Sequence, residues 1–332
     1  MAQVQAQEHV SEAPLVLFTV CVPAAVGVTA CAALLGGSVP FAVLALAVAT
    51  LGMAGSIFHL ARPLRAPGSL RNLPNSHLSQ EIGAVIAFWL LLALWLAAEL
   101  LEPAALQAAA SAAAPTDGIQ SALPFWASVP WATVSLAARV LAAAWGVALL
   151  WVVNRAYRVP TRPAWDGPEG LMELLAIACG LGPALYVALA CALALAAGGW
   201  GAGGTGAVAP LPVLIPAAAA VLALVGAALA VAAHCRRHQR LAGAAAEDER
   251  LTSMLEGLAA QSPQALFALC VCIAPAALEL VALLYAVAPS FAPLLLLNWA
   301  CITALQLAGA ILQRTRFYDL PAQEPHRAPL RK

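Results

Sequence analysis

Residues 81–101 read EIGAVIAFWLLLALWLAAELL, and they decide the fold class because they are apolar for long enough to cross a membrane. An α-helix needs about 20 residues to span a hydrocarbon core about 30 Å thick. Hydrophobic residues make up 63% of the 332 positions and charged residues only 10%, which is more apolar surface than one soluble core buries. The protein is therefore predicted to be a polytopic membrane protein.

Eight segments of this kind are predicted along the sequence, at 14–35, 38–61, 81–101, 129–153, 169–198, 211–234, 263–288 and 290–313. A segment in lipid has to satisfy its own backbone hydrogen bonds, so each is predicted to be a helix. The expected fold is all-α: a bundle of eight transmembrane helices that forms a single integral membrane domain over residues 1–332. We expect the first segment to be retained as a helix of the protein. A cleavable signal peptide has Lys or Arg before its apolar part, and no Lys or Arg precedes this segment.

The basic residues are distributed unevenly over the connections between these segments. Of the 16 Lys and Arg residues, all except Arg139 lie in the connections after the second, fourth and sixth segments or in the C-terminal tail. Because cytoplasmic loops of membrane proteins carry the excess of Lys and Arg, both termini and these connections are predicted to be cytoplasmic.

The remaining connections and the cysteines show no motif for a metal centre. The stretches 102–128 and 198–210 are rich in Ala, Gly and Pro and are expected to be flexible external loops. The stretch 235–262 mixes both charge signs with Leu and Met, which fits a helix along the membrane surface or a solvated linker equally well. None of the 8 Cys residues forms a C-x-x-C pair, so neither an iron–sulfur cluster nor a zinc site is expected in this protein.

Residues 56–81, SIFHLARPLRAPGSLRNLPNSHLSQE, form a dense polar run between two apolar segments. Pro63 disfavours helix at the residue before it, so His59 is expected on the last turn of the second segment, with Arg62 and Arg65 just beyond. Ser79 is expected to cap the third segment, which puts Glu81 in the first turn of that helix. An imidazole, two guanidinium groups and a carboxylate are thus predicted to meet at one membrane interface.

These side chains suit the oxidation of a lipid-borne quinol, which releases two protons and two electrons. His59 or Glu81 can accept a proton, and Arg62 or Arg65 can hold a quinone oxygen. The opposing interpretation is that the Arg and His side chains anchor the helix ends at the lipid headgroups.

Two further charges lie within apolar segments. Arg139 is midway along 129–153 and Glu279 is deep in 263–288, where an unpaired charge costs about 2.5–3.5 kcal/mol. We expect the two to pair, either as a clasp between helices or as one link of a proton path. Haem is not expected, because only His59 and His234 among the six His residues adjoin apolar segments.

The stretch FHLARPLRAPGSLRNLPNSHLSQEIG at 58–83 resembles the membrane anchor subunit of anaerobic dimethyl sulfoxide reductases. APLVLFT at 13–19, NRAYRVPTRPAW at 154–165, the Gly–Pro at 182–183 and RTRFY at 314–318 agree with this resemblance. The likeness spans most of the eight segments, and its most specific part is the stretch between the second and third.

The resemblance implies a non-catalytic subunit that binds menaquinol and takes part in its oxidation. By similarity, His59 and Glu81 are tied to quinol binding, and the subunit holds no haem, iron–sulfur cluster or molybdenum. The implied partners are an iron–sulfur subunit and a molybdopterin catalytic subunit in the bacterial inner membrane, with no role for nucleic acid. Docking residues for these partners are expected at Arg71, Asn72, Asn75, Arg155, Tyr157 and Arg314.

Two other functions stay open at this point. Dimethyl sulfoxide reductases whose catalytic subunit is exported face the periplasm, whereas the distribution of Arg puts the motif in the cytoplasm. In its predicted orientation the protein therefore resembles a related group of anchors, which serve cytoplasm-facing molybdoenzymes that oxidise sulfite and reduce quinone. A transporter that holds its substrate with Arg139 and Glu279 is the alternative from another class, although no internal repeat is evident.

Overall fold

The structure is a computed structural model, and it describes residues 13–59, 68, 70–113, 125–158, 165–196, 214–245 and 292–319. Within these ranges the long elements are all α-helices, and no strand occurs. They are α1 (Ala13–Leu35), α2 (Val39–His59), α4 (His77–Ala113), α5 (Trp131–Tyr157), α6 (Glu169–Ala196), α7 (Leu214–Ala245) and α10 (Ala292–Asp319), with short 3-10 turns η2 (Leu70–Asn72) and η3 (Phe125–Ser128).

Seven of the described helices are long and apolar enough to cross a membrane. This confirms a polytopic, helical membrane protein, with seven candidate spans in the described ranges against the eight segments expected. The segment expected at 263–288 lies outside the described residues.

Two helices, α4 and α7, differ most from their predicted bounds. The third span was expected at 81–101, but α4 begins at His77 and continues through Pro103 to Ala113, so the start of the expected external loop is helix. The hydroxyl of Ser76, not that of Ser79, accepts the capping hydrogen bond, from the Ser79 amide at 3.3 Å. Glu81 therefore lies in the second turn of α4.

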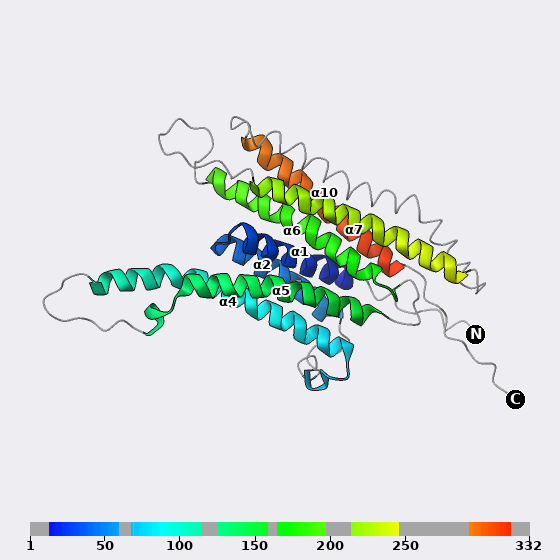
Figure 1. Ribbon diagram of the computed structural model, residues 1–332, viewed down its shortest axis with the longest axis horizontal. Helices are drawn as coiled ribbons and strands as arrows, with labels where there is room; N and C mark the ends of the chain where they lie inside the picture. The colour runs from blue at the N-terminus through cyan, green and yellow to red at the C-terminus, as the bar shows by residue number, and fades with distance from the viewer. Residues whose placement is uncertain are drawn as a thin grey trace.

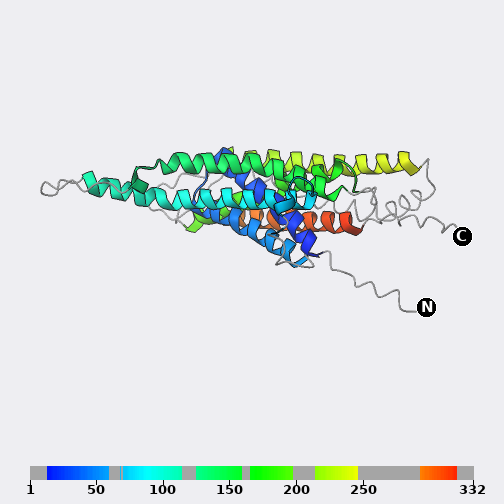
Figure 2. The ribbon, with the colours of Figure 1, turned by 90° about the horizontal axis from the view of Figure 1, so that it is seen from below.

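The helix α7 is also longer than expected. It was predicted to end near residue 234, yet it runs on to Ala245 and includes the first part of the 235–262 stretch. At about 1.5 Å per residue, the 37 residues of α4 and the 32 of α7 are about 55 and 48 Å long, against a hydrocarbon core of about 30 Å. Figures 1 and 2 show that the end of α4 extends well beyond α1, α2 and α6.

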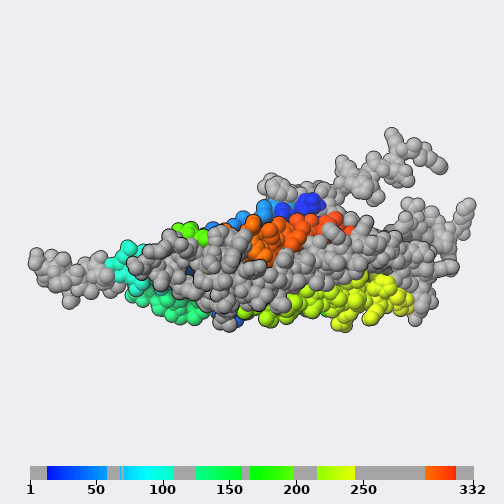
Figure 3. Space-filling model, turned by 90° about the horizontal axis from the view of Figure 1, so that it is seen from above, coloured from blue at the N-terminus to red at the C-terminus, as the bar shows by residue number. Residues whose placement is uncertain are grey.

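The helix α1 is the centre of the bundle. It packs against α2, α5, α6 and α10, and most of its side chains are buried. Figure 1 shows α1 between α5 on one side and α6 on the other, with α7 and α10 beyond α6. The face in Figure 3 presents α10 between the start of α1 and the second half of α7.

Small residues bring α1 and α6 into close contact. A Cβ atom on Gly27 would collide with the backbone carbonyl oxygen of Ala178 and would lie 2.9 Å from the Cα atom of Gly182. Membrane helices gain little from the hydrophobic effect, so backbones that approach this closely add van der Waals contact that larger residues would prevent. The backbone contact at Gly27 therefore fixes the distance between the two helices.

The helix directions follow from contacts at one end of the bundle. Near this end, Thr19 of α1 and Glu173 of α6 meet Arg237 of α7 and Arg314 of α10. We call it the basic end. Since Thr19 and Glu173 lie in the first half of their helices and the two Arg residues in the second half, α1 and α6 leave the basic end, whereas α7 and α10 both run toward it.

We predict that Gly27→Ala destabilises the protein because its methyl group meets backbone that cannot move aside. Overpacking of this kind costs about 1–3 kcal/mol. Gly243→Ala is the matched control, because nothing lies within 4 Å of a Cβ atom there. Thermal unfolding in detergent measures both variants, and equal unfolding temperatures would contradict the role of the Gly27 contact.

Candidate functional site

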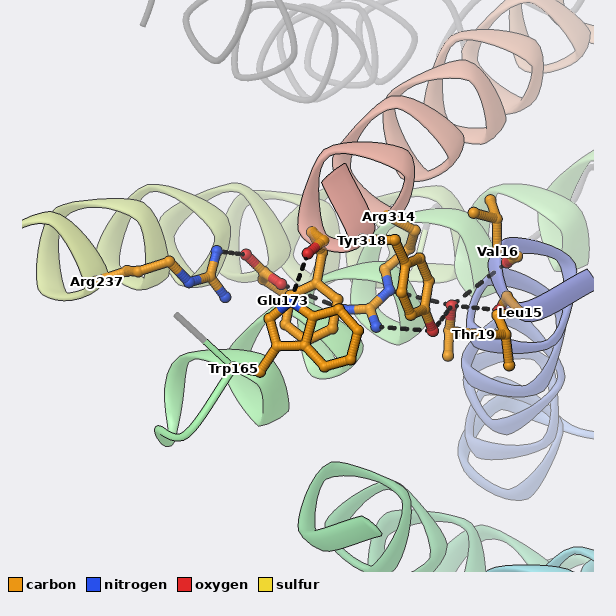
Figure 4. A network of polar contacts seen from close by, with 9 residues as sticks. Leu15, Val16, Thr19, Trp165, Glu173, Arg237, Arg314 and Tyr318 are labelled. Carbon is orange, nitrogen blue, oxygen red and sulfur yellow. Dashed lines mark hydrogen bonds and ion pairs between the residues drawn. The ribbon is translucent and has the colours of Figure 1, made fainter. Parts of the chain in front are cut away.

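A buried network of charged side chains occupies the basic end. The Glu173 carboxylate accepts a hydrogen bond from Arg237 Nη1 at 2.5 Å and another from Arg314 Nη1 at 3.3 Å (Figure 4). The relative exposures of Glu173, Arg237 and Arg314 are 3%, 6% and 1%, so water does not screen these contacts. We call these three residues the arginine–glutamate triad. It connects α6, α7 and α10.

Two hydroxyl groups extend the triad to α1. Arg314 Nε donates to Thr19 Oγ1 at 3.1 Å, and the Thr19 hydroxyl donates to the Leu15 carbonyl oxygen at 2.8 Å (Figure 4). The Tyr318 hydroxyl lies 3.5 Å from both Thr19 Oγ1 and Arg314 Nη2. Four helices that are far apart in sequence are thus joined at one point.

The triad carries a net positive charge, because two guanidinium groups share one carboxylate. Nε and Nη2 of Arg237 are buried and have no hydrogen-bond partner among the described residues. The ring of Phe317 supplies part of the missing stabilisation, since its centroid lies 4.1 Å from Arg314 Cζ and 5.4 Å from Arg237 Cζ.

An aromatic cluster, consisting of Tyr157, Trp165, Phe317 and Tyr318, covers the triad. Trp165 stacks on Phe317 with the ring centroids 5.1 Å apart, and its Nε1 donates to the Phe317 carbonyl oxygen at 2.7 Å. The Tyr157 ring lies 5.9 Å from that of Tyr318. These rings place the end of α5 and the start of α6 against the end of α10.

A second ion pair lies beside the triad. Nε and Nη2 of Arg240 donate to the two carboxylate oxygens of Glu169 at 3.3 and 3.2 Å. Glu169 is buried, whereas the side chain of Arg240 is 32% exposed. This pair is electrically neutral and ties α7 to the first turn of α6.

Glu81 is a buried carboxylate of a different kind. Its relative exposure is 8%, and no hydrogen bond or ion pair to it occurs among the described residues. The Ser135 hydroxyl donates to Glu99 at 2.6 Å, and this bond sets the antiparallel register of α4 and α5. The register puts Glu81 level with Val153, which is one turn from Tyr157 along α5.

The other residues predicted to bind quinol are described only in part or not at all. His59 is the last residue of α2, and its side chain lies outside the described residues, as do Arg62 and Arg65. Glu81 is thus the one member of that set whose surroundings the structure gives. Within the described ranges, His, Cys, Asp and Glu side chains do not gather in threes that could hold a metal ion.

Arg139 lies near one end of the bundle, not at its middle as the sequence predicted. Its Nη1 donates at 3.3 Å to the Gly37 carbonyl oxygen, in the connection between α1 and α2 at the end opposite the basic one. Glu279 lies outside the described residues, so the pairing of the two stays a prediction.

The residues expected to dock partners fall into two groups. Arg71, Asn72, Asn75 and Arg155 are exposed, as docking requires, and Tyr157 is half-buried. Arg314 is buried in the triad, so the expectation that it faces a partner is wrong for this structure: its guanidinium group is directed at α1 and α6.

A comparison with known families bears on the first third of the sequence. Residues 7–111 match the family model of the DMSO reductase anchor subunit, DmsC. This confirms the resemblance over α1, α2 and most of α4, a stretch that includes His59 and Glu81. A search of curated proteins finds no match.

Much of the site lies outside the match to the DmsC model. Glu173, Arg237 and Arg314 are all beyond residue 111, and sequence reasoning missed the triad. A signal was available: Glu169 and Glu173 stand one turn apart at the start of an apolar segment, and Arg237 and Arg240 stand one turn apart at the end of another. Carboxylates in a membrane helix normally have cationic partners on its neighbours.

We predict that Thr19→Val lowers stability by about 1–3 kcal/mol, because it leaves a buried donor of Arg314 without its acceptor. Thr315→Val is the matched control: its hydroxyl is exposed and donates only to the Ile311 carbonyl oxygen of its own helix. Thermal unfolding in detergent compares the two, and equal losses would contradict a role for Thr19 in the network.

Proposed function

We propose that this protein is the quinol-binding membrane anchor of a three-subunit molybdopterin oxidoreductase of the dimethyl sulfoxide reductase type. It would pass electrons between menaquinol and an iron–sulfur partner, which serves a molybdopterin catalytic subunit. The observation that carries the proposal is Glu81: a buried carboxylate without a partner among the described residues, in the part of the sequence that matches the anchor family.

Glu81 is suited to accept a proton from a quinol. A buried carboxylate with no fixed ion pair is free to change its protonation state, whereas Glu169 and Glu173 are each held by Arg. Glu81 lies near the basic end, at which α2 ends with His59, so a ring that enters from the bilayer would reach both. In the proposed step a quinol gives two electrons to the iron–sulfur partner, one proton to Glu81 and one proton to His59. Arg62 and Arg65 bind the quinone oxygens.

The exposed residues of the basic end support a docking role. Arg71, Asn72 and Asn75 protrude around η2, and Arg155 is exposed at the end of α5. We propose that the iron–sulfur subunit docks on this end, close to Glu81. The direction of electron flow then depends on the partner, and a sulfite-oxidising complex that reduces quinone is the alternative. The transporter alternative has no supporting observation, because Arg139 lies near one end of the bundle.

We further propose that the protein crosses the inner membrane eight times. The helices α7 and α10 both run toward the basic end, so the 46 residues between them have to return across the membrane. The segment 263–288 is long enough for this crossing. With eight crossings, the excess of Arg puts both termini and the basic end in the cytoplasm.

We predict that Glu81→Gln and His59→Ala each lower quinol-dependent turnover of the assembled complex by about 100-fold, the usual effect of losing a proton acceptor. Activity of the catalytic subunit with a reduced dye should be unchanged. Glu102→Gln and His77→Ala are the matched controls. Normal quinol oxidation in both Glu81→Gln and His59→Ala would overturn the proposed site.

The crossing number has its own test. Alkaline phosphatase inserted after position 290 should be active, as in the periplasm, whereas insertions after positions 245 and 325 should be inactive. The same activity at positions 245 and 290 would contradict an eighth crossing between them.

A further inference from the structure

Three sets of charged side chains lie at the basic end among the described residues, and all but the partly exposed Arg240 are buried. Glu169 and Arg240 form a neutral pair, the arginine–glutamate triad carries one net positive charge, and Glu81 carries one negative charge when it is ionised. The whole group is therefore neutral only while Glu81 is a carboxylate. Once Glu81 takes up a proton, one positive charge is left buried and uncompensated.

We propose that the triad is the fixed counter-charge of Glu81 and sets the pH at which Glu81 accepts a proton from the quinol. The triad does not touch the quinol; it acts on Glu81 through the field of its unbalanced guanidinium group. Glu173, Arg237 and Arg314 are thus positioning residues for the reaction. This inference rests on the proposed function of Glu81.

The aromatic cluster connects the two sets of charges. Tyr157, one turn from Glu81, packs against Tyr318 with ring centroids 5.9 Å apart, and the Tyr318 hydroxyl lies 3.5 Å from Arg314 Nη2. Because aromatic rings in edge-to-face contact separate the two charges, the medium between them has a lower dielectric constant than water, and the field is felt over a longer distance.

Other ionisable groups near Glu81 add a constant background. On α5 they are Tyr157 and the exposed Arg155, and on α4 itself His77 is exposed. The η2 turn contributes the exposed Arg71, and α2 has no ionisable side chain other than His59. His59, Arg62 and Arg65 have side chains outside the described residues. All of these groups are unchanged when the triad is altered, so differences between triad variants isolate its contribution.

The sign of the effect follows from the charge of the triad. Quinol oxidation needs the ionised Glu81, so the rate of turnover rises with pH as Glu81 loses its proton. We call this rising part of the pH profile the acid limb. Glu173→Gln raises the net charge of the triad to two positive charges, which favours the carboxylate and moves the limb to lower pH. Arg237→Gln lowers the net charge to zero and moves the limb to higher pH. At an effective dielectric constant of about 20, a unit charge that acts over a distance on the order of 10 Å shifts a pKa by about one unit, so we expect shifts of that order in each case.

The experiment measures the pH profile of quinol-dependent turnover in membranes that contain the assembled complex. Glu173→Gln and Arg237→Gln should move the acid limb in opposite directions. Combined in one protein, they leave Arg314 as the one charge of the triad, so the limb should return to its wild-type position. The matched control combines Glu169→Gln with Arg240→Gln, which removes a neutral buried pair and should leave the limb in place.

A purely structural role gives a different result, because lost contacts lower turnover without opposite shifts of the limb. Shifts of the same sign, no shift, or failure of the double variant to restore the limb would overturn the inference. If Glu173→Gln does not assemble, Arg237→Gln and the double variant still decide, since the first should shift the limb and the second should not. Glu81→Gln separates the two proposals: if it leaves turnover intact, the proposed function itself has failed.

Discussion

The shared carboxylate of Glu173 is the interaction on which the basic end depends. Two guanidinium groups in a membrane interior would repel each other and would each cost several kcal/mol to bury, and one carboxylate between them removes the repulsion and part of that cost. The same contact brings together α6, α7 and α10, and Thr19 adds α1. A buried ion pair adds little net stability, but removal of one partner leaves a charge buried and uncompensated.

In the rest of the bundle, the contacts between helices depend on small side chains rather than on charged ones. Along α1 and α6, glycine and alanine let the backbones approach until the Cα atoms at Gly27 and Gly182 are almost in contact. Close packing holds the middle of the bundle, and polar contacts hold its two ends: the triad at one, and Arg139 on the Gly37 carbonyl oxygen at the other. Glu81 belongs to neither set of contacts among the described residues.

The fold class could be predicted from the sequence because long apolar segments have only one stable form in lipid. The ends of the helices could not be predicted in the same way. The helix α4 continues past Pro103 into a stretch that was interpreted as a loop from its Ala and Pro content, although Ala is the best helix former. The pairing within the triad was out of reach for another reason. Arg314 bonds with Thr19 across 295 residues, and a basic residue at a helix end usually faces water, so its burial follows only from the way the helices pack. The place of Glu81 near a helix start could be predicted because it is a local feature, whereas its part in quinol binding stays a proposal.

The parallel course of α7 and α10 affects how the protein is made. Ribosomes deliver α6 and α7 first, so Glu173 meets Arg237 early, while Arg314 emerges only after the intervening residues have been synthesised. Until α10 is inserted, Thr19 and Glu173 lack the guanidinium group that fills the space between α1 and α6. The bundle therefore closes last at the very place where the charges meet, and a nascent polypeptide that stalls before α10 would present polar surface to lipid and become a substrate for membrane proteases.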